Sequence, residues 1–274
     1  MADPRDVVIK TYSERAGDYD QEGNLESCWG QVAKRALQQL NLKDSYEVVA
    51  DIGCGAGHAL RDLASRPSSV ARFVGVEPAE EMRGHAAVNL EGVDNVTVMD
   101  GRFEQLPLES NSVDYLFSIL AFHWVTDLEG SVKELARVLK PDGEMDLFFV
   151  GRDAGVAFVK QTTPIFIRYM GLGWLVESAK MRKHLSRDGA AELFASTFPS
   201  ERLTVTEEYK TYYDDLEGHW SWWVPRLGAH FAAMPPDKRE QCDRESREAI
   251  ASLATEDGIP YEVHLLHVQL RSDA

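Results

Sequence analysis

The feature that most constrains this chain is a hydrophobic run that carries an acid and opens into a loop of glycines. Tyr46 to Ile52 reads as a buried strand, and residues 53–57 follow it as Gly-Cys-Gly-Ala-Gly before a helical pattern over residues 58–65. Glycines adopt positive φ angles and let a backbone approach a ligand closely. In an open parallel sheet such a turn lies at the carboxyl end of a strand, where ligands bind.

Short β-rich runs alternate with helical patterns between about residue 46 and residue 150. After the first strand and helix, the patterns predict strands over 72–76, 95–99, 113–119 and 144–150, and helices over 79–90 and 129–139. Strands that are this apolar and alternate with helices are typical of a parallel sheet covered on both faces. The sequence therefore predicts a doubly wound α/β fold.

The spacing of the glycines separates two classes of cofactor. A dinucleotide-binding fingerprint reads Gly-x-Gly-x-x-Gly, whereas here the third glycine, Gly57, comes one residue early and His58 takes the fingerprint position. Asp51, two residues before the first glycine, suits a ligand that carries an ammonium and a sulfonium better than it suits a pyrophosphate. A nicotinamide-dependent oxidoreductase and a plain strand-to-helix turn without a ligand stay as alternatives.

Polar residues also follow the next three strands. Glu77 ends the second strand, and an acid about 20 residues after the loop is placed to accept both hydrogens of a ribose diol. Residues 100–104 follow the third strand as Asp-Gly-Arg-Phe-Glu, and residues 121–124 follow the fourth as Ala-Phe-His-Trp. We expect one crevice to collect all of them, because the carboxyl ends of parallel strands meet at one edge of a sheet.

Together these blocks resemble the class I S-adenosylmethionine-dependent methyltransferases of the small-molecule type. The resemblance covers roughly residues 10–150 and rests on D-x-G-x-G-x-G, E-P, E-x-L-P, S-x-D and E-x-x-R-V-L-K-P-x-G. His123-Trp124 and the final segment 257–263 are similar to a subset that includes trans-aconitate, malonyl-carrier-protein and juvenile-hormone-acid methyltransferases. The resemblance implies a Rossmann-like sheet, mostly parallel with an antiparallel last strand, and S-adenosylmethionine as the cofactor.

The same resemblance implies methyl transfer to a small-molecule acceptor, with a carboxylate as the first hypothesis. N- or C-methylation of a specialised metabolite is one alternative. A non-catalytic, cofactor-binding regulatory protein is another, and Arg102 favours it, because the family often has at that position an acid that holds the adenine amino group. Asp100 or the backbone of Phe103 is then the candidate for the amino contact.

The resemblance also assigns cofactor contacts to individual residues. Asp51 and the glycine loop would hold the methionine part, Glu77 the ribose hydroxyls, and Pro78 and Met82 one face of the adenine. The complete set of expected cofactor-binding residues is Tyr12, Tyr19, Asp51, Gly53, Cys54, Gly55, Gly57, Glu77, Pro78, Met82, Gly101, Arg102, Phe103, Ser118 and His123.

His123 is the candidate catalytic residue, because its unperturbed pKa of about 6.5 suits a general base. A carboxylate acceptor needs no base, and His123 would then orient it; capping of the next helix is the structural alternative. The candidate substrate-binding residues are Trp124, Trp220, Trp223 and Arg226. An aromatic wall beside an arginine suits an apolar molecule that ends in a carboxylate, although packing of the tryptophans against the sheet edge explains them equally well.

We expect a single methyltransferase domain over residues 1–274. Its parts are an N-terminal helical lid (1–45), a cofactor-binding core (46–150), a substrate-covering helical insertion (151–260) and a last strand (261–274). Within the lid, Tyr12 to Asp20 matches the family's Y-x-x-x-A-x-x-Y-D pattern, and its aromatic rings would favour a nearby sulfonium.

Composition argues against several other functions. The chain has 29 basic and 45 acidic residues and a net charge of −16, so a nucleic-acid partner is not expected. No stretch approaches the roughly 20 apolar residues that cross a bilayer, and the N-terminus lacks the apolar core of a signal peptide, which predicts a cytoplasmic protein without membrane contact. Three scattered cysteines show neither disulfide nor zinc spacing, so no metal is expected. The oligomeric state is not indicated.

Overall fold

The computed structural model describes residues 9–10, 12–14, 16–19, 26–173, 176, 184–223 and 234–272. The strands of this part of the chain are β1 (Val48–Ile52), β2 (Arg72–Val76), β3 (Val96–Met99), β4 (Val113–Ile119), β5 (Leu139–Val150), β6 (Leu203–Asp214) and β7 (Ile259–Leu270). The helices are α2 (Ala16–Tyr19), α4 (Cys28–Gln39), α5 (His58–Ser65), α6 (Glu80–Asn89), η1 (Phe122–Trp124), α7 (Leu128–Val138), α8 (Val156–Met170), α10 (Arg187–Ala195), η2 (Ser200–Arg202) and α12 (Pro236–Ala251).

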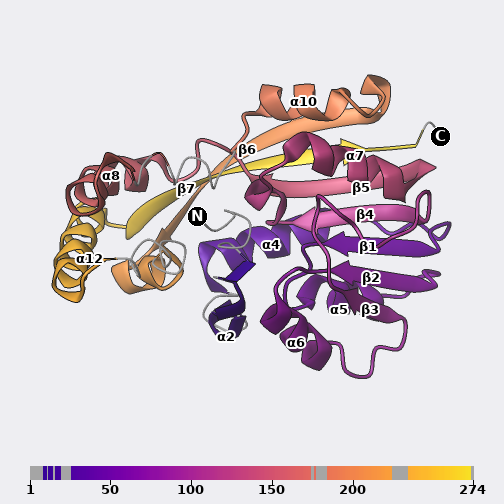
Figure 1. The fold of residues 1–274 in the computed structure, drawn as a ribbon, viewed down its shortest axis with the longest axis horizontal. Coiled ribbons are helices and arrows are strands. Elements are labelled where there is room, and N and C mark those ends of the chain that lie inside the picture. The colour runs from indigo at the N-terminus through magenta and orange to yellow at the C-terminus, as the bar shows by residue number, and fades with distance from the viewer. Residues whose placement is uncertain are drawn as a thin grey trace.

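One sheet runs through the molecule in the order β3-β2-β1-β4-β5-β7-β6 (Figure 1). The strands from β3 to β5 are parallel, and β7 lies antiparallel between β5 and β6. The chain reverses its direction of winding between β1 and β4, which is the point where an open α/β sheet forms a ligand crevice. The predicted α/β class, mostly parallel with an antiparallel last strand, is confirmed.

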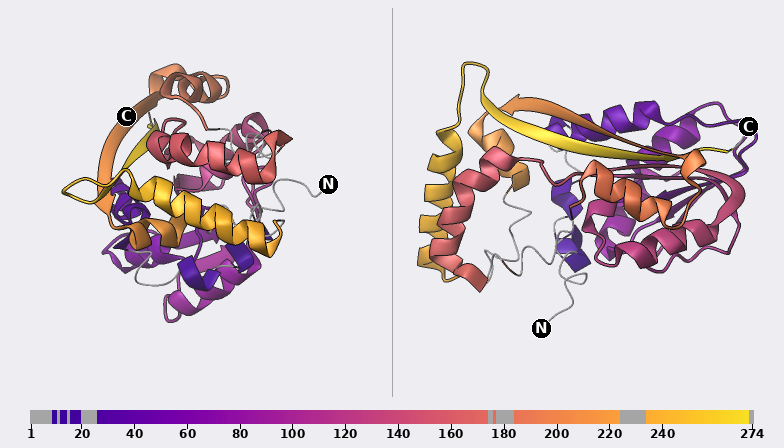
Figure 2. Two further views of the ribbon diagram at one scale, coloured as in Figure 1. Left: turned by 90° about the vertical axis from the view of Figure 1, so that its left-hand side faces the viewer. Right: turned by 90° about the horizontal axis from the view of Figure 1, so that it is seen from above.

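Helices cover both faces of the sheet, because the buried strands are apolar on both sides. Val49 and Tyr115 belong to the hydrophobic cluster of α4, α5 and α6, whereas Ala50 and Leu116 belong to the cluster of α7 and α10. Figure 2 shows these two helical layers on opposite sides of the strands. These helices cover the two faces of the sheet, so a ligand site is expected at the carboxyl ends of the parallel strands.

The last two strands extend well beyond the rest of the sheet. β6 pairs with β7 from Leu203↔Leu270 to Asp214↔Ile259, but β5 follows β7 only as far as Val150↔Leu265. The free part of this two-stranded ribbon leads to a separate layer in which α8 packs against α12 (Figures 1 and 2). We call this layer, with the helix over residues 216–223, the distal helices.

The predicted boundaries agree closely with the structure, and one difference has a clear cause. The last parallel strand was expected to begin at residue 144, yet β5 begins at Leu139, which pairs with Val113. The register shifts before Glu144 pairs with Tyr115, so residues 140–143, for which a Pro-Asp-Gly turn was expected, lie within β5 as a bulge.

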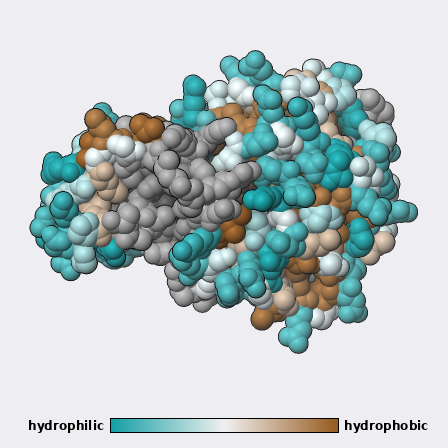
Figure 3. All heavy atoms as spheres, in the orientation of Figure 1, coloured by the Kyte–Doolittle hydropathy of each residue, from teal (hydrophilic) through white to brown (hydrophobic). Residues whose placement is uncertain are grey.

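The described surface in the view of Figure 3 is largely hydrophilic, in keeping with the acidic composition. None of the helices in the described ranges combines the length and apolar character needed to cross a membrane.

Candidate active site

The loop after β1 and the acid after β2 form one hydrogen-bonded unit. The backbone N–H groups of Gly53 and Cys54 donate to the carbonyl of Val76 at 2.7 and 3.2 Å. One carboxylate oxygen of Glu77 then accepts from the N–H of Gly55 at 3.0 Å, and the other accepts from the N–H of Ala79 at 2.9 Å. The two predicted ligand-binding elements are thus fixed to each other before any ligand binds.

The loop needs glycines because its backbone has positive φ angles and packs closely against a neighbouring turn. Gly53, Gly55 and Gly57 have φ angles of 77°, 54° and 79°, which side chains rarely adopt. A Cβ on Gly53 would also lie 2.3 Å from the Cβ of Ala121, in the turn after β4. The loop therefore packs directly against the segment that leads to His123.

Two buried acids stand together beneath this loop. Asp51 is 2% exposed at the end of β1, and Glu77 is 8% exposed. Burial, and then the negative charge of Glu77, raise the pKa of Asp51 well above its usual value. Burial also raises the pKa of Glu77, although its bonds from Ala79 and Gly55 act in the opposite direction. A ligand with positive charge would relieve this repulsion.

A cavity of about 330 Å³ opens over the loop, at the carboxyl ends of β1, β2 and β4. Its size falls at the lower end of the range for small-molecule sites. Of the expected cofactor-binding residues, those that line it are Tyr12, Gly53, Cys54, Gly55, Glu77, Pro78, Met82, Gly101, Arg102, Phe103 and His123. The structure thus brings together residues that are far apart in the sequence.

Aromatic rings enclose the side of the cavity that holds His123. His123 lies in η1 and is 8% exposed, and its ring centroid is 5.0 Å from that of Trp124. Trp124 makes an edge-on contact with Tyr12 at 5.8 Å. His123, Trp124 and Tyr12 all line the cavity, so the imidazole of His123 lies among aromatic rings in its wall.

The segment after β3 holds the departure from the family pattern. Arg102 and Phe103 both line the cavity. The carboxylate of Asp100 instead lies outside the lining residues and forms an ion pair with Arg83 at 3.0 Å, with 73% of the side chain exposed. The backbone of Phe103 is therefore the better placed of the two predicted substitutes for the missing acid.

Three predicted cofactor residues lie just behind the described cavity wall. Asp51 is buried under the loop, as stated above. Ser118 is fully buried, and its hydroxyl donates to the carbonyl of Ile52 at 2.6 Å, which ties β4 to β1. A Cβ on Gly57 would lie 3.0 Å from Leu90, so this glycine lets α5 pack close to the end of α6. These three residues support the cavity wall without lining it.

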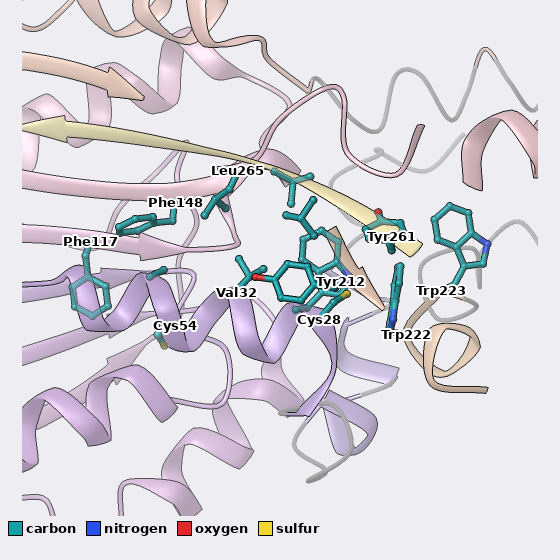
Figure 4. Close-up of a cluster of buried hydrophobic side chains, with 14 of the residues drawn as sticks. Cys28, Val32, Cys54, Phe117, Phe148, Tyr212, Trp222, Trp223, Tyr261 and Leu265 are labelled. Atoms are coloured by element: carbon teal, nitrogen blue, oxygen red, sulfur yellow. The ribbon is translucent and has the colours of Figure 1, made fainter. Parts of the chain in front are cut away.

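The predicted substrate-binding residues separate into three groups. Trp124 lines the cavity. Trp220 and Trp223 are 6% and 7% exposed in the helix over residues 216–223, where Trp223 contacts Phe158 at 5.4 Å. Figure 4 places Trp223 at the far end of this buried cluster from Cys54. Arg226 and the side chain of Tyr19 lie outside the described residues.

Sequence reasoning missed several residues of the cavity wall, among them Trp29, Ala33 and Leu120. Trp29 and Ala33 line it from α4, one turn apart. In the sequence they fit an apolar helix face, and nothing in the pattern indicates that this face borders a cavity. Leu120 also lines it, with a φ of 58° that is unusual for a residue with a side chain. Its backbone N–H donates to the carbonyl of Phe148 at 2.7 Å, which holds this strained turn in place.

The residues present fit S-adenosylmethionine. The buried acids Asp51 and Glu77 favour a cationic ligand, and Glu77 has lone pairs left for a diol. Pro78, Met82 and Phe103 offer apolar surface for an adenine. Cys54 is not a nucleophile in this setting, because burial and then the two acids raise the pKa of its thiol well above the ordinary value.

Comparison with known proteins supports the same assignment. Residues 50–146 match the family model described as a methyltransferase domain. A malonyl-[acyl-carrier protein] O-methyltransferase of Methylovorus sp. is 31% identical over 153 residues, which are 53% of this chain and 50% of that protein. An uncharacterized methyltransferase-like protein of Schizosaccharomyces pombe is 30% identical over 171 residues, 62% of this chain and 64% of that protein. The chain thus spans less than two thirds of the length of either relative.

Solved structures show the same fold. The YcgJ protein of Bacillus subtilis gives a TM-score of 0.60 at 21% identity, over 89% of this chain and 100% of that chain. Phosphoethanolamine N-methyltransferase 2 of Haemonchus contortus, in complex with S-adenosyl-L-methionine, gives 0.61 at 14% identity, over 100% of this chain and 61% of that chain. Residues 50–146 therefore match a methyltransferase domain, and the solved structures show that the chain has the fold of these proteins.

Proposed function

We propose that this protein transfers the methyl group of S-adenosylmethionine to a carboxylate of a small, largely apolar molecule. The observation that carries the proposal is the position of His123, whose imidazole lies beside Trp124 in the wall of the cavity that also contains the glycine loop and Glu77. The malonyl-carrier-protein methyltransferase of Methylovorus sp., whose name specifies an O-methyl product, supports an acid as the acceptor.

The cofactor supplies a methyl group on a positively charged sulfur, which is already activated for displacement. The protein then has to align the acceptor and exclude water, and good alignment is worth roughly 7–11 kcal/mol of barrier. In the proposed arrangement Asp51 and the glycine loop hold the charged methionine part, while Glu77 accepts from the ribose hydroxyls. The aromatic ring of Tyr12 favours the sulfonium through cation–π attraction.

His123 orients the acceptor in this proposal. A carboxylate is ionised near neutral pH and needs no base, so an imidazole N–H that donates to one oxygen directs the other oxygen toward the methyl group. Trp124 and Trp29 provide flat apolar surface for the rest of the molecule. With a hydroxyl acceptor the same imidazole would accept the proton.

In this proposal the N-terminal region and the insertion help to enclose the cavity. Residues 1–45 contribute Tyr12, Trp29 and Ala33 to its wall, which supports a covering role for the N-terminal region. The insertion over 151–260 reaches the wall through Trp222, which contacts Trp29 edge-on at 5.8 Å. Trp223 contacts Trp222 edge-on at 5.8 Å, so in this proposal it supports the wall without touching the acceptor. We also propose a cytoplasmic location, supported by the free thiols of Cys28, Cys54 and Cys242.

The test is a methyl-transfer assay with labelled S-adenosylmethionine and a panel of small carboxylic acids, with a malonyl thioester as one member. We expect label in a methyl ester, identified by mass spectrometry, and a large loss of turnover in His123→Ala. His85→Ala, in α6 and outside the described cavity lining, is the matched control and should behave as wild type. Label on nitrogen or carbon, or no transfer to any acid, would contradict the proposal.

A further inference from the structure

A second histidine lies against His123. The ring centroids of His123 and His184 are 6.0 Å apart, and the planes meet at 68°, which is an edge-on contact. The two residues come from different parts of the chain. His123 follows β4 in the cofactor-binding core, and His184 precedes α10 in the insertion. His123 lines the cavity, whereas His184 is absent from the described lining.

The segment that carries His184 is fixed by its backbone. The carbonyl of Leu185 accepts a hydrogen bond from the N–H of Arg152, just after β5, at 3.0 Å. The next residue, Ser186, is the N-cap of α10, and its hydroxyl accepts from the N–H of Gly189 at 3.1 Å. Because α10 packs its buried Phe194 into the core beneath the sheet, His184 is attached to the rigid part of the molecule.

The ring of His123 contacts two neighbouring rings. Trp124 lies at 5.0 Å with a tilt of 40°, and His184 lies edge-on at 6.0 Å. The last torsion of a histidine is soft and roughly two-fold, so packing decides which ring nitrogen faces a cavity. The two nitrogens differ, because a neutral imidazole donates from one and accepts at the other.

We propose that His184 is a positioning residue, which sets the ring orientation and the tautomer of His123; this inference rests on the role of His123 in the proposed function. His184 does not touch the acceptor. It fixes which nitrogen of His123 donates into the cavity, in the way that a third group orients a catalytic base in other enzymes.

The first experiment measures kcat and KM in three variants. His184→Phe keeps a flat ring but removes both nitrogens, while His184→Asn and His184→Gln place an amide near one or the other nitrogen position. We expect His184→Phe to lower kcat by about tenfold to a hundredfold and to leave the KM for S-adenosylmethionine unchanged. One of the two amide variants should restore most of the activity. Wild-type kcat in His184→Phe, with unchanged thermal stability, would overturn the proposal.

The second experiment needs no acceptor, so it separates this inference from the proposed function. Nitrogen-15 NMR of the histidine rings reports the tautomer directly, with the His123 signals assigned from His123→Gln and the protein saturated with S-adenosylhomocysteine. We expect His184→Phe to change the ring nitrogen shifts of His123, and the control His85→Phe to leave them unchanged. Unaltered His123 shifts in His184→Phe would overturn the inference. If the shifts change but no acid is methylated, the proposed function fails and the positioning role stands.

Discussion

The carboxylate of Glu77 bridges two turns of the sheet edge, since it accepts from the backbone N–H of Gly55 at 3.0 Å and of Ala79 at 2.9 Å. The Gly55 bond joins the loop after β1 to the end of β2. Each carboxylate oxygen keeps a second lone pair for another donor. Glu77 can therefore hold the loop and a ribose diol at the same time.

This double role gives the first prediction. Glu77→Gln keeps one acceptor oxygen and should weaken binding of S-adenosylhomocysteine by about 1–3 kcal/mol through the loss of charged hydrogen bonds. Calorimetry with a deoxyribose analogue is the control, because an analogue without the hydroxyl pair has less to lose. An equal loss for both nucleosides would show that Glu77 acts on the loop alone.

Asp51 should show a trade-off between stability and binding. Its carboxyl has a pKa in the folded protein well above the ordinary value near 4, so the folded state holds this proton more tightly than the unfolded state. Its contribution to stability therefore falls as the pH rises from about 4 through the raised pKa. Asp51→Asn should raise the melting temperature of the ligand-free protein at neutral pH, and this gain should vanish below about pH 4.

The same variant should bind the cofactor more weakly, because a neutral amide does not favour a cation. In the wild type, affinity for S-adenosylmethionine should decrease as the pH falls through the raised pKa values of Asp51 and Glu77. Scanning calorimetry and titration calorimetry across pH measure the two effects. A less stable Asp51→Asn protein at neutral pH, or one with undiminished affinity, would refute this reading of the buried acids.

Gly53→Ala should disrupt the site through shape alone. The added Cβ would lie 2.3 Å from that of Ala121, and the φ of 77° is unfavourable for alanine. We expect a loss of cofactor affinity and of stability. Gly84→Ala, in α6 with no atom near its added Cβ, is the control and should be neutral or stabilising. Wild-type binding by Gly53→Ala would mean that the loop does not need this close packing.

Trp223→Ala should act mainly on stability. Trp223 is 7% exposed and packs against Phe158 and Trp222, so truncation should cost about 3–5 kcal/mol. Denaturant unfolding measures this cost, and affinity for S-adenosylhomocysteine should not change. Trp124→Ala, at the cavity, should show the converse, with a small stability loss and a higher acceptor KM. A changed acceptor KM in a fully stable Trp223→Ala protein would place Trp223 in direct contact with the acceptor.

Much of the core could be predicted because its signals are local. The strand periodicities gave β2 and β4 at their observed bounds, and acids at strand ends marked the crevice. The glycine spacing predicted the loop, although it does not show that Gly57 serves helix packing while Gly55 faces the cavity. A motif predicts which loop contributes to the site, but the backbone geometry decides whether a given residue of that loop lines the cavity or supports its wall.

The rest depends on contacts between distant segments, which no local pattern encodes. Trp29 reads as part of an amphipathic helix face and becomes a cavity wall only when α4 packs across the sheet. His184 reaches His123 because β5, the Arg152 turn and α10 fold back on the core. Trp220 and Trp223 looked like an acceptor wall, yet their burial with the distal helices was equally compatible with the sequence.

Titration calorimetry of the whole chain with S-adenosylmethionine, with a nicotinamide dinucleotide titrated in parallel, tests the assignment of the cavity most directly. We predict binding of the sulfonium nucleoside at a single site, weakened in Asp51→Asn and Glu77→Gln, and no heat from the dinucleotide. Absence of binding by S-adenosylmethionine, or binding that both substitutions leave unchanged, would contradict the role given to the loop and its two acids.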